Sequence, residues 1–302
     1  VVLMVAAGQG AQQRILDRIR DMGANLVVVN AGKTQIIAGR QRQMTTVTTL
    51  FPRDAEAIAK ECPAAALVAA SVSKKMTARW EEQTANTSVV GIAPEGFAIR
   101  NIEPAGGRFF TEVEDRALKR LAVLGPTVAR NLFEDKNPVG ESIRIGRVPF
   151  EVIGVTHPKG IDQNGADQDD LILVPLGTAM RRLINVPYVQ SIYVQARASE
   201  LMDAAESQIR NLLRERHRLR EKPDDFTIQN QQTLLAAERE ASQSMTFLIG
   251  SVAGISLVVG GVGILAVMLI SLRERRGEIG LRRALGARRG DIRLQFLIES
   301  IL

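Results

Sequence analysis

The strongest hydrophobic pattern in the chain is a run of 32 residues, 241–272, without a charged side chain. As a helix this run would be about 48 Å long, whereas a bilayer core needs about 20 residues, or about 30 Å. Residues 247–272 are therefore predicted to span a membrane. The preceding residues, 231–246, are polar and contain neither Pro nor Gly, so the same helix is expected to begin as a stalk outside the membrane.

Eight arginines follow within residues 273–293, against three acidic residues. An arginine costs about 3 kcal/mol at the centre of a membrane helix and gains about 1 kcal/mol at an anionic cytoplasmic surface. The arginines therefore place the end of this helix in the cytoplasm, and residues 25–233 on the opposite side of the membrane.

The region before the span alternates between helical and extended patterns. Residues 199–219 are predicted to form a helix that Ser199 caps, with Leu201, Ala205, Ile209 and Leu212 in line. Residues 191–197 are predicted to be a strand with alternate side chains buried. Further helices are predicted at residues 8–22, 52–61, 126–133 and 176–184, and further strands at 25–30, 45–50, 67–73, 88–93, 121–125, 142–155 (a hairpin turning at Gly146), 171–175 and 226–229.

Glycines, prolines and short β-runs dominate residues 105–172, which we interpret as an inserted β-rich subdomain. The flanking helix–strand units predict an α+β layer fold outside the membrane, carried on helical stalks and joined to transmembrane helices. We expect the following division: 1–23, end of a first transmembrane helix and stalk; 24–104, first part of a layered subdomain; 105–172, the insert; 173–230, second part; 231–246, second stalk; 247–272, transmembrane helix; 273–290, cytoplasmic segment; 291–302, start of another transmembrane helix. Both ends have the composition of cut membrane helices, so the chain is expected to be a fragment.

The formal charge of +6 is concentrated in the arginine-rich block, so topology explains it better than nucleic-acid binding does. The single cysteine, Cys62, cannot form a disulfide within the chain. Gly32-Lys33-Thr34 ends like a phosphate-binding loop, but Val27 stands where that motif requires glycine. We therefore expect no nucleotide site, no catalytic residue and no cofactor in this chain.

Three further motifs favour structural interpretations. The acidic loop, residues 162–170, lacks calcium-loop spacing because Ala166 replaces the required glycine. His157 and His217 have no Cys or His partner nearby in the sequence, so neither suggests a metal site or a catalytic base. The glycines of the apolar span remove side-chain bulk, which favours close packing by a second helix rather than dinucleotide binding. These packing positions are Gly250, Gly254, Gly260, Gly261 and Gly263.

Residues 273–290 predict a short amphipathic helix, roughly 278–285, that Gly286 stops. Such a helix between two membrane helices can lie in the headgroup plane or fit a groove on a soluble partner. The physics of the sequence leaves both alternatives open.

Residues 274–279, 281–287 and 291–299 resemble the permease signature of the FtsX/MacB-type ABC transporter superfamily, and residues 255–264 resemble its second transmembrane helix. The outer region is similar to the MacB-like periplasmic domain in six places. These are Asn86-Thr-Ser-Val-Val-Gly91, Gly107-Arg-Phe-Phe110, Val123-Leu-Gly125, Asn137-Pro-Val-Gly140, Phe150-Glu-Val-Ile-Gly-Val155 and Gln168-Asp-Asp170.

The resemblance implies a porter-like layer with an inserted subdomain in the periplasm of a bacterial inner-membrane protein. It implies a homodimer or paired permease, an ABC ATPase subunit or fused domain, and a possible periplasmic adaptor leading to an outer-membrane channel. It also implies a cytoplasmic coupling helix that contacts the ATPase. The residues expected at that contact are Glu278, Ile279, Arg282, Arg283 and Ala287.

The leading hypothesis is a permease that couples cytoplasmic ATP hydrolysis to periplasmic motion and substrate efflux. The alternative is a transmembrane sensor or regulator whose outer domain binds a ligand, a cell-wall partner or a lipoprotein partner. The sequence names no substrate.

Overall fold

The computed structural model describes residues 25–37, 40–44, 48–161 and 166–288, together with residues 290, 292, 294 and 298. The chain divides into one unit within residues 13–238 and a second that includes residues 239–302. Each unit is described by itself.

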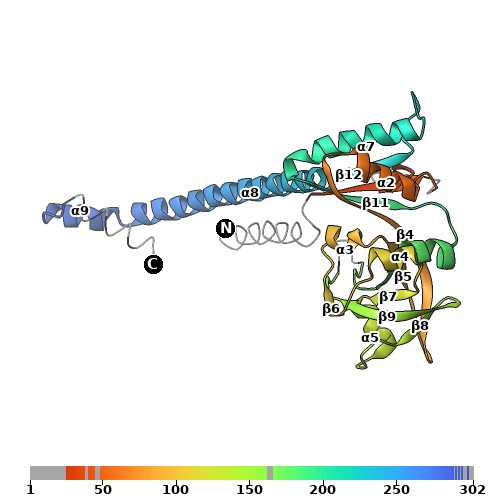
Figure 1. The fold of residues 1–302 in the computed structure, drawn as a ribbon. Helices are drawn as coiled ribbons and strands as arrows, with labels where there is room; N and C mark the ends of the chain where they lie inside the picture. The colour runs from red at the N-terminus through yellow and green to blue at the C-terminus, as the bar shows by residue number, and fades with distance from the viewer. Residues whose placement is uncertain are drawn as a thin grey trace. The chain divides into compact units, whose positions relative to one another are not determined.

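A ten-stranded mixed sheet organises the larger unit (Figure 1). The strands follow the order β12, β1, β11, β4, β5, β10, β7, β9 and β6, and β8 pairs with both β4 and β9. Parallel pairing occurs between β5 and β10 and between β7 and β9. The ten strands of this sheet are β1 Leu26–Ala31, β4 Ala65–Trp80, β5 Gln83–Ile92, β6 Pro104–Gly107, β7 Leu121–Leu124, β8 Ser142–Ile145, β9 Val148–Thr156, β10 Leu171–Pro175, β11 Ser191–Ala196 and β12 Phe226–Asn230. Strands β2 Lys33–Ile37 and β3 Arg40–Met44 form a separate two-stranded antiparallel sheet.

Helices pack against this sheet at several places. Helices α2 and α7 contact each other, α2 contacts β4, and α7 contacts β1 and β12. Figure 1 shows α7 lying beside β12. Helix α3 contacts β4 and β11, and α5 contacts β5. The helices are α2 Pro52–Glu61, α3 Glu95–Ile99, α4 Glu112–Arg116, α5 Pro126–Phe133, α6 Leu176–Thr178 followed by a π-helix Ala179–Ile184, a 3₁₀ turn Ser199–Leu201 before α7 Met202–Arg216, α8 Gln231–Glu274 and α9 Arg276–Ala284.

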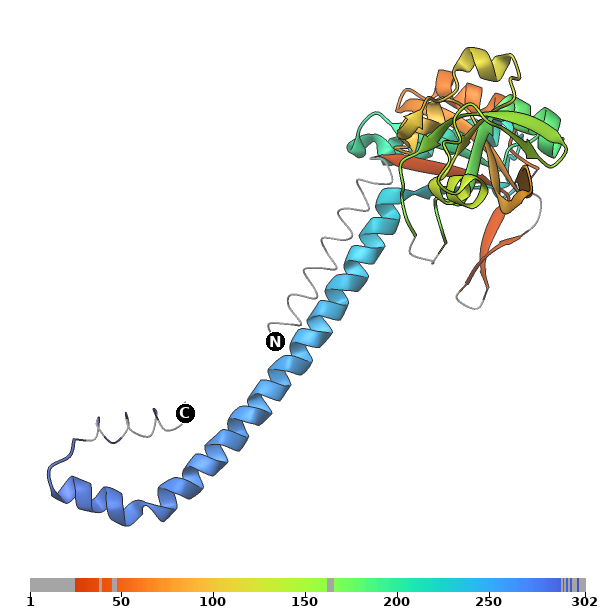
Figure 2. The ribbon, with the colours of Figure 1, turned by 90° about the horizontal axis from the view of Figure 1, so that it is seen from below.

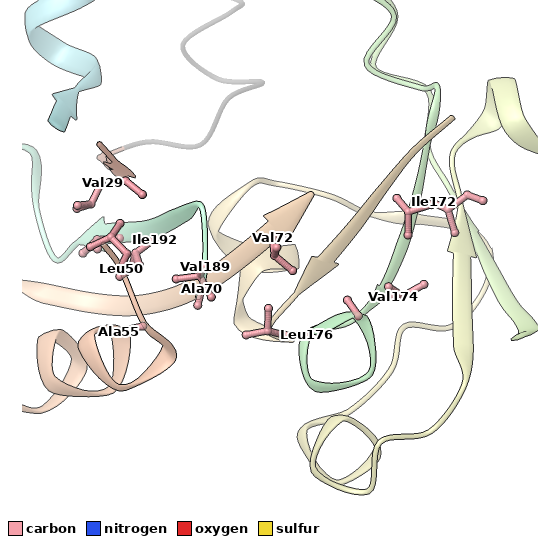
Figure 3. Close-up of a cluster of buried hydrophobic side chains, with 14 of the residues drawn as sticks. Val29, Leu50, Ala55, Ala70, Val72, Ile172, Val174, Leu176, Val189 and Ile192 are labelled. Carbon is pink, nitrogen blue, oxygen red and sulfur yellow. The ribbon is translucent and has the colours of Figure 1, made fainter. Parts of the chain in front are cut away.

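The core of the larger unit lies on both faces of the sheet. One cluster runs from the strands under α2 and α7 to α5 and β8, and Figure 3 shows Val29, Leu50 and Ile192 gathered within it. A second cluster includes Phe97 and Phe110. Since burying one large apolar side chain contributes about 1.5–3 kcal/mol, these two clusters dominate the stability of the unit.

Several predicted elements are confirmed with their bounds. The predicted helices at 52–61 and 126–133 are α2 and α5, and the predicted strand at 171–175 is β10. The predicted hairpin turns at Gly146, whose φ is 58°. In β11, Ile192, Val194 and Ala196 are buried as predicted. The residue limits of the insert, 105 and 172, stay a prediction.

Other predictions are wrong in part. Of the predicted strand 45–50, residues 45–47 lie outside the described residues, residues 48–49 are a turn and a bend, and Leu50 forms only an isolated bridge to Val189. The strands predicted at 67–73 and 88–93 are confirmed as strands but were predicted too short, because residues 67–73 lie within β4 and residues 88–92 form the C-terminal half of β5. Ser199 does not cap a helix, because its hydroxyl donates to Asn25 Oδ1. Helix α7 begins later, so Met202 and Leu213 are buried and Leu201 is 39% exposed.

The second unit contains most of α8, which is one uninterrupted helix (Figure 2). The prediction of a single helix from Gln231 through the apolar run is therefore confirmed. The helix predicted at residues 8–22 lies entirely outside the described residues. The start of another membrane helix, predicted at residues 291–302, lies mostly outside them.

Candidate membrane-spanning helix and coupling segment

By length and composition, one segment of α8 can cross a membrane: Gly250–Glu274, 25 residues with a mean hydropathy of 2.6. It is about 37 Å long, against the roughly 30 Å of a bilayer core. The hydroxyls of Ser251 and Ser256 donate to the carbonyl oxygens of Phe247 and Val252 at 2.8 and 2.9 Å. Both hydroxyls are therefore satisfied within the helix itself, as a lipid environment requires.

The five predicted packing glycines, Gly250, Gly254, Gly260, Gly261 and Gly263, all lie within α8. A Cβ atom added at any of them would meet no heavy atom within 4 Å. At about 100° per residue, positions 250, 254 and 261 fall within an arc of about 40°, while 260 and 263 lie on another side. The helix therefore presents one narrow strip of three glycines rather than a face of five.

Helix α9 begins two residues after α8 ends, with Arg275 between them. Its end is set by Gly286, which has a left-handed φ of 100°. The amide of Ala287 donates to the carbonyl of Arg282 at 3.0 Å, which is the hydrogen bond of a Schellman motif at a helix end. The predicted short helix stopped by Gly286 is confirmed, although it begins at Arg276 rather than near residue 278.

Four of the five predicted coupling residues lie in α9, and Ala287 follows its end. Glu278 and Arg282 form an exposed ion pair at 2.6 Å. On a helical projection residues 278, 279, 282 and 283 span an arc of about 140°. Leu281 and Leu285 lie beside this arc and are 66% and 81% exposed. One partner surface can therefore reach all four residues of the arc.

In the larger unit, the segment Gly107-Arg-Phe-Phe110 has a structural explanation at every position. A Cβ at Gly107 would lie 2.2 Å from the carbonyl oxygen of Ile153, and its φ is 74°. The guanidinium of Arg108 donates twice to the Glu114 carboxylate, at 2.8 Å each, which holds the pKa of Glu114 far below its usual value. The Phe109 ring stacks on Phe97 with centroids 4.0 Å apart, and Phe110 is buried.

Other segments of the resemblance likewise fix the backbone. A Cβ at Gly125 would lie 2.1 Å from the carbonyl oxygen of Asp169. The carboxylate of Asp169 accepts hydrogen bonds from the amides of Lys159 and Gly160. Asn137 Oδ1 accepts one from the amide of Val139, closing a turn. These segments therefore account for the fold rather than for a reaction.

A cluster of charged side chains that the sequence did not suggest joins α2, α7 and the segment before β12. His217 lies at the end of α7, with Nδ1 2.8 Å from Asp225 Oδ1 and Nε2 3.4 Å from Asp54 Oδ2. Arg216 Nε donates to Asp54 Oδ1 at 3.0 Å, and the amide of Phe51 donates to Oδ2 at 2.9 Å. No sequence signal was available, because 163 residues separate His217 from Asp54.

This cluster shifts the pKa values of its members. The hydrogen bonds to Asp54 and to Asp225 raise the pKa of His217, and together they outweigh desolvation, which by itself would lower it. Burial by itself would raise the pKa of Asp54, but hydrogen bonds from His217, Phe51 and Arg216 outweigh burial and lower it. The interactions therefore favour the imidazolium and the carboxylate together.

No group of three His, Cys, Asp or Glu side chains within the described residues could hold a metal ion. The thiol of Cys62 is buried, and burial raises its pKa. In the described part of the acidic loop, the Asp167 carboxylate accepts hydrogen bonds from Thr127 and from the amide of Asp169.

Comparisons with known proteins agree with this architecture. Residues 1–212 match the family model of the MacB-like periplasmic core domain, and residues 250–302 match that of the FtsX-like permease C-terminal region. The chain thus combines a MacB-like periplasmic core domain with an FtsX-like permease region. It belongs to the family of MacB proteins.

Two relatives are each called "Macrolide export ATP-binding/permease protein MacB". The chain is 40% identical over 304 residues to the one from Bdellovibrio bacteriovorus and 39% identical over 302 residues to the one from Rhodospirillum rubrum. In both alignments all of this chain is covered, but only 46% and 45% of the relatives' lengths. The chain therefore spans less than half the length of these proteins.

Two solved structures share the fold. The periplasmic region of MacB from Actinobacillus actinomycetemcomitans aligns with a TM-score of 0.62 at 22% identity, covering 75% of this chain and 98% of that one. The extracellular domain of the noncanonic ABC-type transporter YknZ from Gram-positive bacteria aligns with a TM-score of 0.55 at 19% identity, covering 68% and 100%. The mixed α/β unit therefore has the fold of a MacB periplasmic region.

Proposed function

We propose that this chain transmits the energy of cytoplasmic ATP hydrolysis to its periplasmic unit and so drives export. The ATPase is a partner subunit or a fused domain, and the protein resides in a bacterial inner membrane. Because the relatives are named for macrolide export, a macrolide is the first substrate to test. The proposal extends the family assignment to a mechanism and to particular residues.

The observation that carries the proposal is the continuity of α8. The sheet strand β12 ends at Asn230, and α8 starts at the next residue and continues without interruption to Glu274. A helix is stiff along its axis, so a shift at one end is transmitted to the other if no break absorbs it. In this proposal α8 carries a shift from its end at Glu274, next to α9, to the start of the helix after β12.

The contact with the ATPase is proposed at the arc of Glu278, Ile279, Arg282 and Arg283, with Ala287 at its edge. Ile279 is the apolar residue in this arc, and its three neighbours there are charged: Glu278 is acidic, and Arg282 and Arg283 are basic. An apolar side chain ringed by charged ones is typical of the centre of a small protein interface. Leu281 and Leu285, outside the arc, are available to the membrane headgroup region.

The test compares Ile279→Asp with Leu281→Asp in the full-length protein together with its ATPase. The two changes introduce the same charge on different sides of α9. We expect Ile279→Asp to lower ATP-driven macrolide export at least about tenfold, because a carboxylate buried at an interface costs several kcal/mol. Leu281→Asp should retain export. If Ile279→Asp exports like the wild type in proteoliposomes, the proposed contact is wrong.

We further propose that the strip of Gly250, Gly254 and Gly261 receives a membrane helix of a second permease copy. Small residues at this spacing let two helix backbones approach closely. The periplasmic adaptor and outer-membrane channel expected from the resemblance remain proposals for the assembled exporter. The sensor alternative loses support, because residues 250–302 match a permease region.

A further inference from the structure

A polar cavity of about 260 Å³ lies on the sheet of the larger unit. Its floor is built by four adjacent strands, β11, β4, β5 and β10. The register places Ser71 opposite Ser191, Ser73 opposite Val90, and Leu171 beside Ser88. Residues directly opposite each other in a sheet share a face, so these side chains all point to the cavity side.

The serines of the floor are unexpected on this face. Elsewhere the same face carries a hydrophobic cluster that includes Ile92 and Phe97, and β-branched or aromatic residues suit strands better than serine does. Serine therefore needs another reason at these positions.

Two of the floor serines have protein partners, and two do not. The Ser73 hydroxyl donates to Gln190 Oε1 and the Ser191 hydroxyl donates to Asn30 Oδ1. Among the described residues, the hydroxyls of Ser71 and Ser88 make no hydrogen bond. Ser71 is 4% exposed and lines the cavity. Both hydroxyls line the cavity, so each is available to donate to a ligand there.

The rim of the cavity carries one cation and one anion, each without a charged partner in the part of the chain that the structure describes. The guanidinium of Arg100 lies 5.4 Å from the centroid of the Tyr193 ring and forms no ion pair there. Asp170 has no ion pair there either. By contrast, the neighbouring Asp167 carboxylate is occupied by Thr127 and the Asp169 amide.

We propose that this cavity binds a small zwitterion of amino-acid size, which carries one carboxylate and one ammonium group. Arg100 and the hydroxyls of Ser71 and Ser88 would bind the carboxylate, because all three can donate to it. Asp170 would bind the ammonium group. The volume lies just below the usual range of roughly 300–1,000 Å³ for drug-sized ligands, so the site suits a small polar molecule. This inference is independent of the proposed transport function.

The test is equilibrium dialysis of radiolabelled glycine against the purified full-length protein in detergent. Acetate and methylammonium, which each carry one of the two charges, serve as competitors. The variants are Arg100→Gln, Asp170→Asn and Ser71→Ala, with Lys75→Gln as the control. Lys75 lies opposite Ser88 in the sheet but does not line the cavity. Thermal unfolding of each variant checks the fold.

We expect Arg100→Gln and Asp170→Asn each to weaken glycine binding about tenfold or more, since each removes a charge-assisted hydrogen bond. Ser71→Ala should weaken binding several-fold without loss of folding, whereas Lys75→Gln should bind like the wild type. Three results would overturn the proposal: no glycine binding up to 10 mM, unchanged binding by the folded Ser71→Ala and Arg100→Gln variants, or competition by acetate as strong as by glycine. The last result would show a general anion site.

Discussion

His217 is expected to make the stability of the periplasmic unit depend on pH. Its side chain is 10% exposed and lies between the carboxylates of Asp54 and Asp225, which are 6% and 31% exposed. The ring also packs edge-on against Phe226, with centroids 6.0 Å apart. The perturbation we consider is His217→Gln, which retains polarity and removes the titrating group.

The direction of the effect follows from the two pKa shifts. The pKa of His217 is raised from 6.5, so its stabilisation is fully present below about pH 6.5 and is lost as the pH rises through the folded-state value. The pKa of Asp54 is lowered from 3.8, so its stabilisation is present above about pH 4 and is lost as the pH falls through its folded-state value. The cluster should therefore contribute most between about pH 4 and pH 6.5.

The magnitude follows from the contacts. At pH 5.5 His217 makes a charged hydrogen bond at 2.8 Å and a longer contact at 3.4 Å, and hydrogen bonds to charged groups contribute about 1.5–3 kcal/mol. The substitution should cost about that much at pH 5.5. At pH 8.5 the neutral ring keeps only ordinary hydrogen bonds, so the cost should fall below about 1 kcal/mol.

The assay is urea unfolding of a soluble fragment, residues 25–230, at the two pH values. The periplasmic region of the Actinobacillus relative was crystallised without the rest of its chain, which makes this fragment reasonable. The matched control is His157→Gln, since His157 is exposed, and it should change the unfolding free energy by less than about 0.5 kcal/mol at either pH. An equal cost of His217→Gln at pH 5.5 and pH 8.5 would show that the charge of the imidazolium does not stabilise the unit.

Two further predictions concern the Gly107–Phe110 segment in the same unfolding assay. Gly107→Ala should destabilise the fragment by about 2 kcal/mol or more, because the new methyl would lie 2.2 Å from the Ile153 carbonyl oxygen. The control, Gly106→Ala, should be nearly neutral, because its methyl would meet nothing within 4 Å. Similar costs for the two substitutions would contradict the packing argument. Arg108→Lys should lower the unfolding free energy by about 1 kcal/mol, because it removes the paired hydrogen bonds to Glu114. Arg116 forms an exposed pair with Glu112, so Arg116→Lys should lower it by less than about 0.5 kcal/mol. Equal effects would show that burial of Glu114 is unimportant.

The accuracy of the sequence-based predictions depended on how local the determining interactions are. Helix α2 and helix α5 each carry a proline in the first turn and an apolar face, so their own residues set their bounds. The outer part of β4 was missed because its side chains are largely polar or exposed. It is a strand because residues up to Trp80 pair with β5, which begins at Gln83, and Ala78 and Arg79 also pair with β8. The hairpin with β5 is local and β8 lies over 60 residues away, but a pattern of alternating hydrophobic residues detects neither pairing when the side chains are polar.

The sites differ in the same way. The apolar span and the arginine block could be predicted because a bilayer acts on each residue independently, so composition alone carries the signal. The cluster around His217 and the serine-floored cavity depend on register between strands and on contacts across more than 100 residues, which no local pattern encodes.

The segments that carry the family resemblance lie mostly where the backbone has no freedom. A Cβ atom added at Gly107 or at Gly125 would lie within 2.2 Å of a backbone carbonyl oxygen. The carboxylate of Asp169 closes a turn by accepting hydrogen bonds from two backbone amides. Any sequence with this fold must meet those constraints, whatever it transports. Ser71, Arg100 and His217 lie outside these segments and meet no such backbone requirement. Residues of this second kind, rather than the shared segments, are therefore where the ligand and pH response of this particular chain should be sought.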